Sequence, residues 1–217
     1  MAHSLSKLGT FEQCAAKYKF RYLDKLPQGA KSAAASRGID LHETIDAFLQ
    51  RRIDGPLQSP LDFYQGFLGG LREIPGILPE YKFAVDRTWT GLTVWEGDSV
   101  YVRAVFDLLT PPISDQVEVY DWKSGKIYEN HRDQRELYSV LAVAKYPEAK
   151  RVRATSVYVD SGQQRGEVYE LADLAGARSR WENRLARLES ATEFPFNPQF
   201  SCRWCPYSKA QGGPCLF

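Results

Sequence analysis

The stretch Val117-Glu118-Val119-Tyr120-Asp121-Trp122-Lys123 has the alternating pattern of a β-strand and ends in two charged residues. Because side chains at positions i and i+2 of a strand lie on the same face of a sheet, Asp121 and Lys123 are expected to share one site. Val117 and Val119 precede them on that face and are expected in the core. Buried charges need compensation, which a metal bound by the carboxylate would provide. A salt bridge at an exposed strand end is the alternative.

A second predicted strand, from about residue 100 to 110, contains Asp107 within a buried apolar row. A short linker, Pro111-Pro112-Ile113-Ser114-Asp115, makes the two strands hairpin neighbours. We therefore expect Asp107 and Asp121 at one level of the sheet. Two carboxylates in a poorly solvated place repel each other unless a cation lies between them, and such hard oxygen ligands suit Mg²⁺ or Mn²⁺.

The helical periodicity around His42 adds a third candidate ligand. Leu41, Ile45, Phe48 and Leu49 form an apolar stripe with His42 on its flank, which predicts a helix from about 37 to 52. A hydrogen-bonded core histidine is the alternative to a metal ligand. Further helices are expected near 6–24, 131–146 and 173–190, and further strands near 80–89, 92–96, 151–160 and 166–171. This order of elements predicts an α/β fold with a mixed sheet.

These residues resemble the motifs of the PD-(D/E)xK nucleases, within them the RecB-like branch that includes the small CRISPR-associated iron–sulfur exonucleases and the AddB nuclease domain. The matching blocks occur in the family's order and span residues 4–215, as Ser4, Ser6 and Leu8 before Cys14 and Tyr18, then Gly38-x-x-x-His42, Asp107, Asp121-x-Lys123-x-Gly125-Lys126, Gln134-x-x-x-Tyr138 and the C-terminal cysteines. Two positions depart from the pattern. Ala104 stands where glycine is usual and Ala15 where proline is common, but neither change removes a reactive group.

The resemblance implies a restriction-endonuclease-like core, with a central mixed β-sheet flanked by helices, in a single nuclease domain covering residues 1–217. It implies that His42, Asp107, Asp121 and the backbone carbonyl of Trp122 hold Mg²⁺ or Mn²⁺. With Asp107 and Asp121, Lys123 would be catalytic. Gln134 and Tyr138 would contact DNA or position Lys123, with an ordinary amphipathic helix as the alternative.

The chain has four cysteines, Cys14 near the start and Cys202-x-x-Cys205 with Cys215 near the end. Neither a charged-then-apolar leader nor a run of about 18 apolar residues is present, so we expect a cytoplasmic protein without a membrane partner. In a reducing compartment disulfides are disfavoured. The resemblance implies a 4Fe–4S cluster with Cys14 as its fourth ligand, formed by residues 1–30 and 192–217, and Zn²⁺ at the same four cysteines is the alternative.

The size and charge of the chain limit its function. With 217 residues, 43% of them hydrophobic, the chain can bury one good-sized core but has no room for a helicase motor. Its formal net charge is +1, so any nucleic-acid surface must be local. The expected function is metal-dependent DNA exonuclease activity from single-stranded ends. The alternative is a nucleic-acid-binding or end-processing assembly module for spacer acquisition or recombination, with weak or partner-dependent nuclease activity and with CRISPR, phage or repair proteins as partners.

Overall fold

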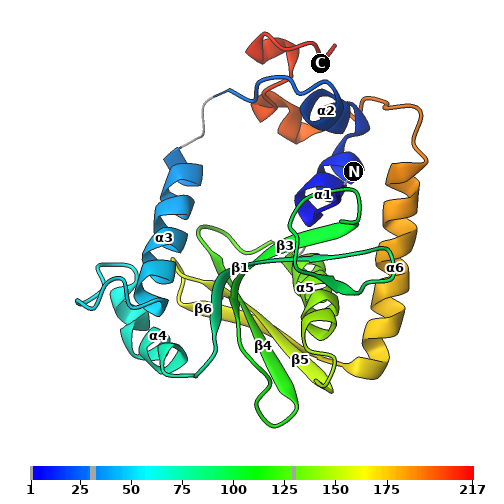
Figure 1. The fold of residues 1–217 in the computed structure, drawn as a ribbon. Helices are drawn as coiled ribbons and strands as arrows, with labels where there is room; N and C mark the ends of the chain where they lie inside the picture. Colours follow the sequence, from blue (N-terminus) through cyan, green and yellow to red (C-terminus); the bar gives the residue numbers. More distant parts are fainter. Residues whose placement is uncertain (1, 30–32, 129–130) are drawn as a thin grey trace. The chain divides into compact units, whose positions relative to one another are not determined.

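The computed structural model describes residues 2–29, 33–128 and 131–217, which fall into two compact units (Figure 1). We name them the sheet unit and the cysteine unit. The sheet unit comprises the described residues between 33 and 179 together with Ala2. The cysteine unit comprises residues 3–29 and 180–217, from both ends of the chain. Met1 and Ala30, which belong to the expected cysteine region, lie outside the described residues.

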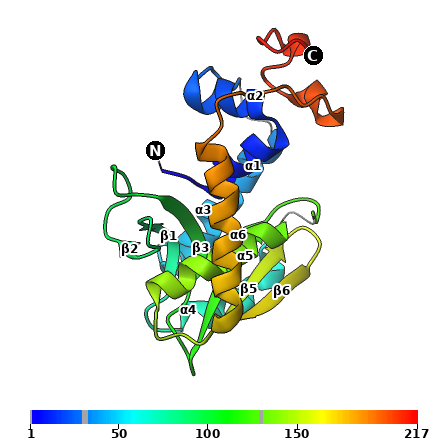
Figure 2. The same cartoon turned by 90° about the vertical axis from the view of Figure 1, so that its right-hand side faces the viewer.

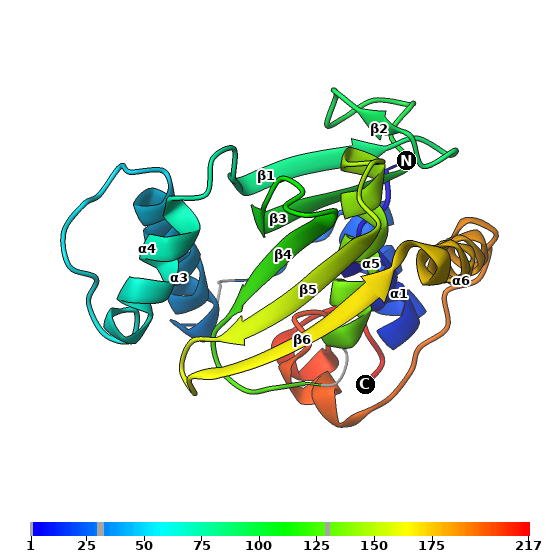
Figure 3. The ribbon, with the colours of Figure 1, turned by 90° about the horizontal axis from the view of Figure 1, so that it is seen from below.

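In the described part of the chain, one sheet of six strands has the order β2-β1-β3-β4-β5-β6 (Figure 3). The strands are β1 (Leu78–Val85), β2 (Gly91–Leu92), β3 (Val102–Leu109), β4 (Gln116–Lys123), β5 (Arg151–Tyr158) and β6 (Gln163–Glu170). Strands β4 and β5 are parallel, and the other neighbouring pairs are antiparallel. The expectation of a mixed sheet with β3 and β4 as hairpin neighbours is confirmed.

The described chain has helices in all four regions where the sequence predicts them, and further short helices between and after those regions. The described helices are α1 (Leu5–Gln13), α2 (Ala15–Tyr18), the π-helix Lys19–Leu23, α3 (Ala33–Leu49), the 3-10 helix Asp62–Tyr64, α4 (Gln65–Arg72), α5 (His131–Lys145), α6 (Leu171–Glu189) and the 3-10 helices Phe200–Trp204 and Lys209–Gln211. None of these described helices has both the length and the apolar character needed to cross a membrane.

Helices α3 and α4 cover one face of the sheet, and α5 covers the other (Figure 1). The apolar core on the first face is contributed by α3, α4, β3, β4 and β5, and it includes Leu41, Ile45, Leu68, Leu108, Trp122 and Val157. On the second face, the ring of Tyr138 in α5 lies 5.1 Å from that of Phe106 in β3. The sheet is therefore a central layer between helices, as the resemblance implies.

The helix expected over residues 6–24 is interrupted, which corrects that prediction. Ser4 caps α1 by accepting a hydrogen bond from the Lys7 amide at 3.3 Å. Cys14 then has extended backbone angles, φ −163° and ψ 112°, and the helical path resumes at Ala15. The apolar periodicity continues across this residue, so the sequence pattern does not reveal the interruption.

Within the cysteine unit, the N-terminal segment lies beside the C-terminal segment (Figure 2). The Ala16 amide donates to the carbonyl of Pro195 at 3.1 Å. The side-chain amides of Asn197 and Gln199 both donate to the carbonyl of Gln13, at 2.8 and 2.9 Å. These bonds attach the irregular C-terminal segment to the end of α1, immediately before Cys14.

Candidate active site

The end of β4 carries a buried hydrogen-bond network around Asp121. Lys123 Nζ donates to Asp121 Oδ1 and to Gln134 Oε1, both at 2.8 Å. Gln134 Nε2 donates to Asp121 Oδ1 at 2.7 Å, and Ser156 Oγ donates to Asp121 Oδ2 at 3.2 Å. Only 3% of Asp121 is exposed. The strand alternation thus brings Asp121 and Lys123 together as expected, and α5 adds Gln134 to them.

Asp107 lies in β3 where the ladder to β4 stops. The last paired residues are Leu108 with Tyr120, so the next residues in this register are Asp107 and Asp121. Asp107 Oδ2 accepts a hydrogen bond from the backbone amide of Trp122 at 2.7 Å and so satisfies a buried donor of β4. Burial and the neighbouring Asp121 raise the pKa of Asp107 to about 7, although His42 and Lys123 oppose this increase.

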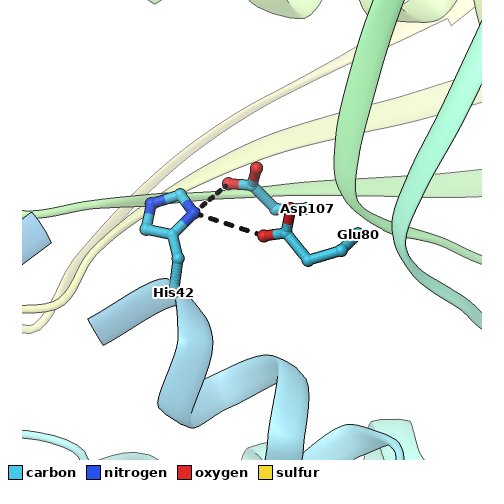
Figure 4. A group of neighbouring side chains, drawn as sticks. All are labelled: His42, Glu80 and Asp107. Carbon is cyan, nitrogen blue, oxygen red and sulfur yellow. Dashed lines mark ion pairs between the residues drawn. The ribbon is translucent and has the colours of Figure 1, made fainter. Parts of the chain in front are cut away.

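Three side chains from different elements converge beside this network, namely His42 of α3, Glu80 of β1 and Asp107 of β3 (Figure 4). One potential ligand atom from each lies within 4.8 Å of the other two. His42 Nδ1 is 3.6 Å from Glu80 Oε1 and 3.5 Å from Asp107 Oδ2. These separations are longer than good hydrogen bonds and leave room for a shared cation.

The other ring nitrogen of His42 is held by the protein backbone. Nε2 donates to the carbonyl oxygen of Trp122 at 2.9 Å. In neutral His42 this bond leaves the Nδ1 lone pair directed at the two carboxylates, which is the arrangement of a metal-ligating histidine. Burial acts to lower the pKa of His42, but Glu80, Asp107 and the Trp122 carbonyl outweigh it and raise the pKa above its ordinary value. The surroundings therefore favour a cation at this point.

Glu80 was not among the residues expected from the sequence. Its neighbours Pro79 and Tyr81 pair with Leu108 and Phe106, so Glu80 lies opposite Asp107 in the register of β1 and β3. Its backbone has φ +44°, a left-handed conformation that is unfavourable for glutamate. A glutamate near the start of a strand is too common to be noticed, and the register that places it opposite Asp107 is not local in sequence.

The donor set fits a hard divalent ion. Two carboxylates and one imidazole are ligands that Mg²⁺ and Mn²⁺ accept in proteins. Of the expected ligands, His42 and Asp107 belong to this group, whereas Asp121 is bonded to Lys123, Gln134 and Ser156 instead. The Trp122 carbonyl accepts from His42. Roles for Asp121 and Trp122 as direct ligands stay predictions.

The histidine and glutamate of this group line a surface pocket along α3. Its lining residues are Ala35, Gly38, Ile39, His42, Glu43, Asp46 and Glu80. Gly38 lets α3 approach the segment after β4 closely, because a Cβ there would lie 3.1 Å from Ser124 Oγ. The close packing of α3 against this segment thus explains why a glycine stands four residues before His42.

Tyr138, expected beside the site, is 8% exposed, and its hydroxyl donates to the backbone carbonyl of Val105 at 2.9 Å. Gln134 lies one helical turn away and bonds directly to Lys123 and Asp121. These contacts favour positioning over DNA contact for both residues, and DNA contact stays a prediction.

The four cysteines, Cys14, Cys202, Cys205 and Cys215, all line one pocket of the cysteine unit. No three of their sulfurs lie within 4.8 Å of one another in the described chain. Cys202 Sγ accepts from the Gln199 amide at 3.3 Å. A closed tetrahedral zinc site, with Zn–S bonds of about 2.3 Å, would bring sulfurs to about 3.8 Å of each other. The thiols share one pocket but are not clustered.

The comparisons with known proteins agree with this fold. The family model of the PD-(D/E)XK nuclease superfamily matches residues 2–210. The fold is similar to the crystal structure of SSO0001, with TM-score 0.52 and 13% identity over 99% of this chain and 86% of the other. It is also similar to a Eubacterium rectale protein proposed to be an exonuclease, with TM-score 0.56 and 12% identity over 99% and 88%. No curated protein matches the chain. At such low identity, the two structures show the fold alone.

Proposed function

Because the chain belongs to the PD-(D/E)XK nuclease superfamily, we propose that it is a metal-dependent exonuclease that cleaves DNA from single-stranded ends. The observation that carries this proposal is the convergence of His42, Glu80 and Asp107 beside the amine of Lys123. An acidic, imidazole-containing ligand group next to an ammonium suits a phosphodiester, whose negative charge increases as it is attacked.

The residues that would hold Mg²⁺ or Mn²⁺ are His42, Glu80 and Asp107, with Asp121 and the Trp122 carbonyl as further proposed ligands. A bound divalent ion supplies Lewis acidity to the phosphate and acidifies a water molecule. The Trp122 carbonyl orients the histidine ring, and the Trp122 amide orients Asp107. Both ligands are therefore positioned by the backbone of one residue, which makes the group well ordered.

The proposed role of Lys123 is to hold the attacking water and to stabilise the charge that develops on the phosphate. Its ammonium is oriented by Asp121 and Gln134, and its side chain is 19% exposed. An amine held in this way needs little reorganisation when substrate binds, and a partly desolvated charge interacts more strongly with phosphate. Gln134 acts here as a positioning residue for both Lys123 and Asp121.

The four cysteines are proposed to bind a 4Fe–4S cluster, with Zn²⁺ as the alternative metal. Their shared pocket supports a common ligand. The proposed compartment is the cytoplasm, where thiols stay reduced and DNA is within reach. The absorption spectrum and metal content of protein purified without oxygen decide between iron and zinc.

The test of the proposed function is cleavage of end-labelled single-stranded DNA, with duplex DNA and RNA of the same sequence in parallel, in Mg²⁺ or Mn²⁺. We expect Lys123→Ala and Asp107→Asn each to lower the rate by at least about 10³-fold. Lys150→Ala is the matched control, because Lys150 is an exposed lysine of the same unit outside the site. Cleavage that survives in the Lys123 and Asp107 variants would contradict the proposal.

A further inference from the structure

The charge of the chain is divided unevenly between the two units. Residues 3–29 and 180–217, which build the cysteine unit, contain ten lysines and arginines against five acidic residues, a formal charge of +5. The rest of the chain therefore carries −4, although the total is only +1. Binding a dication through four thiolates would still leave the cysteine unit net positive. A polyanion is thus attracted to this unit and not to the acidic remainder.

Large apolar side chains are exposed in the same unit. Five of the fifteen exposed large hydrophobic residues of the described chain lie in its last 22 residues, and they are Phe196, Phe200, Trp204, Leu216 and Phe217. Phe200 and Trp204 are the most exposed aromatic residues of this segment, at 75% and 65%. Phe200 and Trp204 adjoin each other, and adjoining exposed apolar side chains are typical of a binding surface.

Arg203 lies against both of these rings. Its guanidinium carbon is 3.2 Å from the centroid of Phe200 and 4.2 Å from that of Trp204. The two ring centroids are 5.3 Å apart, with an angle of 72° between the ring planes. The 3-10 helix that presents them, Phe200–Trp204, is anchored at Gln199, which bonds to both Gln13 and Cys202. The aromatic surface is therefore held by the fold.

This chemistry matches a single strand of nucleic acid. Unpaired bases expose flat faces that stack on aromatic rings, and the phosphates beside them attract arginine. In a duplex the base faces are already stacked and inaccessible. An acidic peptide would use the charge of Arg203 but would leave the two flat rings without a matching group.

We propose that Phe200, Arg203 and Trp204 form a binding site for single-stranded nucleic acid, separate from the metal ligands, in which bases stack on the rings and Arg203 contacts phosphate. The proposal deepens the proposed nuclease function by naming an additional contact for its substrate. It concerns binding only, so it is tested without cleavage.

The test measures binding of an oligothymidylate of about 12 nucleotides by fluorescence anisotropy, in the Asp121→Asn background without Mg²⁺ or Mn²⁺. An oligomer of equal length and charge whose central nucleotides are abasic is the second probe. We expect the Asp121→Asn protein to bind the intact strand more tightly than the abasic one. Adding the double change Phe200→Ala and Trp204→Ala should weaken binding of the intact strand about tenfold and remove this preference. Arg203→Ala should weaken binding of both strands.

Two further variants control the interpretation. Trp204→Phe keeps a ring and should retain the preference for bases, whereas Phe63→Ala removes an aromatic side chain that is 77% exposed in the sheet unit and should change nothing. Equal metal content and melting temperature exclude unfolding. Unchanged affinity for both strands in the double variant overturns the proposal. Polyglutamate is the third probe. If the double change weakens binding of polyglutamate alone, the surface binds an acidic protein instead. Cleavage by the Lys123→Ala variant would overturn the nuclease proposal but would leave the binding result for Phe200, Arg203 and Trp204 unaffected.

Discussion

The backbone conformation of Glu80 destabilises the folded protein, whereas its side chain completes the candidate metal-binding group with His42 and Asp107. A non-glycine residue in the left-handed region costs about 1–3 kcal/mol, and Glu80 has φ +44°. Glu80→Gly should therefore raise the melting temperature of the metal-free protein and yet weaken its stabilisation by Mg²⁺ or Mn²⁺. Thermal unfolding with and without the ion measures both effects.

Glu80→Ala is the matched control, because alanine loses the carboxylate but keeps the strained conformation. It should weaken the response to metal as much as glycine does, without the gain in metal-free stability. If both variants respond to metal as the parent protein does, Glu80 is not a ligand.

The protonation of Asp107 predicts a pH dependence. Its pKa in the metal-free fold is about 7, well above the ordinary carboxyl value, so the folded state keeps a proton that the unfolded chain has released. The contribution of Asp107 to the stability of the metal-free protein should fall as the pH rises from about 4 to about 7, because the folded state binds more protons at this residue in this window. The raised pKa of His42 acts in the same direction, since its contribution is lost as the pH rises through the folded pKa.

A divalent ion competes with these protons, so Mg²⁺ should raise the melting temperature more at about pH 8 than at about pH 6. Asp107→Asn should reduce this difference. An equal response to Mg²⁺ at the two pH values would show that Asp107 does not titrate at the metal site.

At the level of single residues, the sequence predicted what depends on local rules. Strand alternation places Asp121 and Lys123 on one face, and a short hairpin places Asp107 beside them. Glu80 escaped prediction because its position depends on the register between β1 and β3 and on an unusual φ angle. The backbone hydrogen bonds of Trp122 to His42 and Asp107 could not be predicted either. Nearly every residue has the same backbone groups, so the sequence does not mark the ones that bond to these side chains.

Among the elements, β4 was predicted with its observed end at Lys123, because turn residues bound a clearly alternating run. Helix α3 begins at Ala33, earlier than the expected 37, since its first turns are exposed and carry no apolar periodicity. The interruption of the first helix at Cys14 could not be predicted, because cysteine is not a helix breaker. Contacts with residues 195–199, remote in sequence, surround it.

The packing of α3 and α4 against β4 depends on Trp122, whose side chain is buried while its backbone orients two ligands. Its ring stacks on Tyr120 at 5.9 Å and meets Phe67 edge-on at 6.4 Å. Trp122→Ala should destabilise the protein by about 3–5 kcal/mol through lost burial and the cavity left behind. Urea unfolding of the metal-free protein measures this loss.

Trp95→Ala provides the comparison for that measurement. Trp95 is half-buried, and its ring lies under the guanidinium of Arg103 at 4.9 Å. Its loss should cost about 1 kcal/mol or less. If the two variants are equally stable, Trp122 does not hold the helices against the sheet.

Metal binding requires acidic groups, whereas DNA binding requires positive charge, and the molecule places these two kinds of charge in different units. The sheet unit gathers acidic groups that would repel DNA in the absence of a metal ion, whereas the cysteine unit carries most of the excess positive charge. A chain of net charge +1 with a uniform charge distribution could not both bind a metal ion through acidic groups and attract DNA. The nearly neutral total, which offered no support for nucleic-acid binding, therefore results from two opposite contributions.

The cysteine unit is built from both ends of the chain, so its stability depends on keeping them together. A metal centre joining Cys14 to Cys215 would close nearly the whole chain into a loop, and metal–thiolate binding contributes to the folding free energy directly. We expect Cys202→Ser to lower the metal content and the melting temperature together. A loss of about 3 kcal/mol would lower the melting temperature by about 6–12 °C in a protein of this size. Ser201→Ala, at a residue lining the same pocket, should change neither, and an unaltered melting temperature in the Cys202 variant would reject the structural role of the metal.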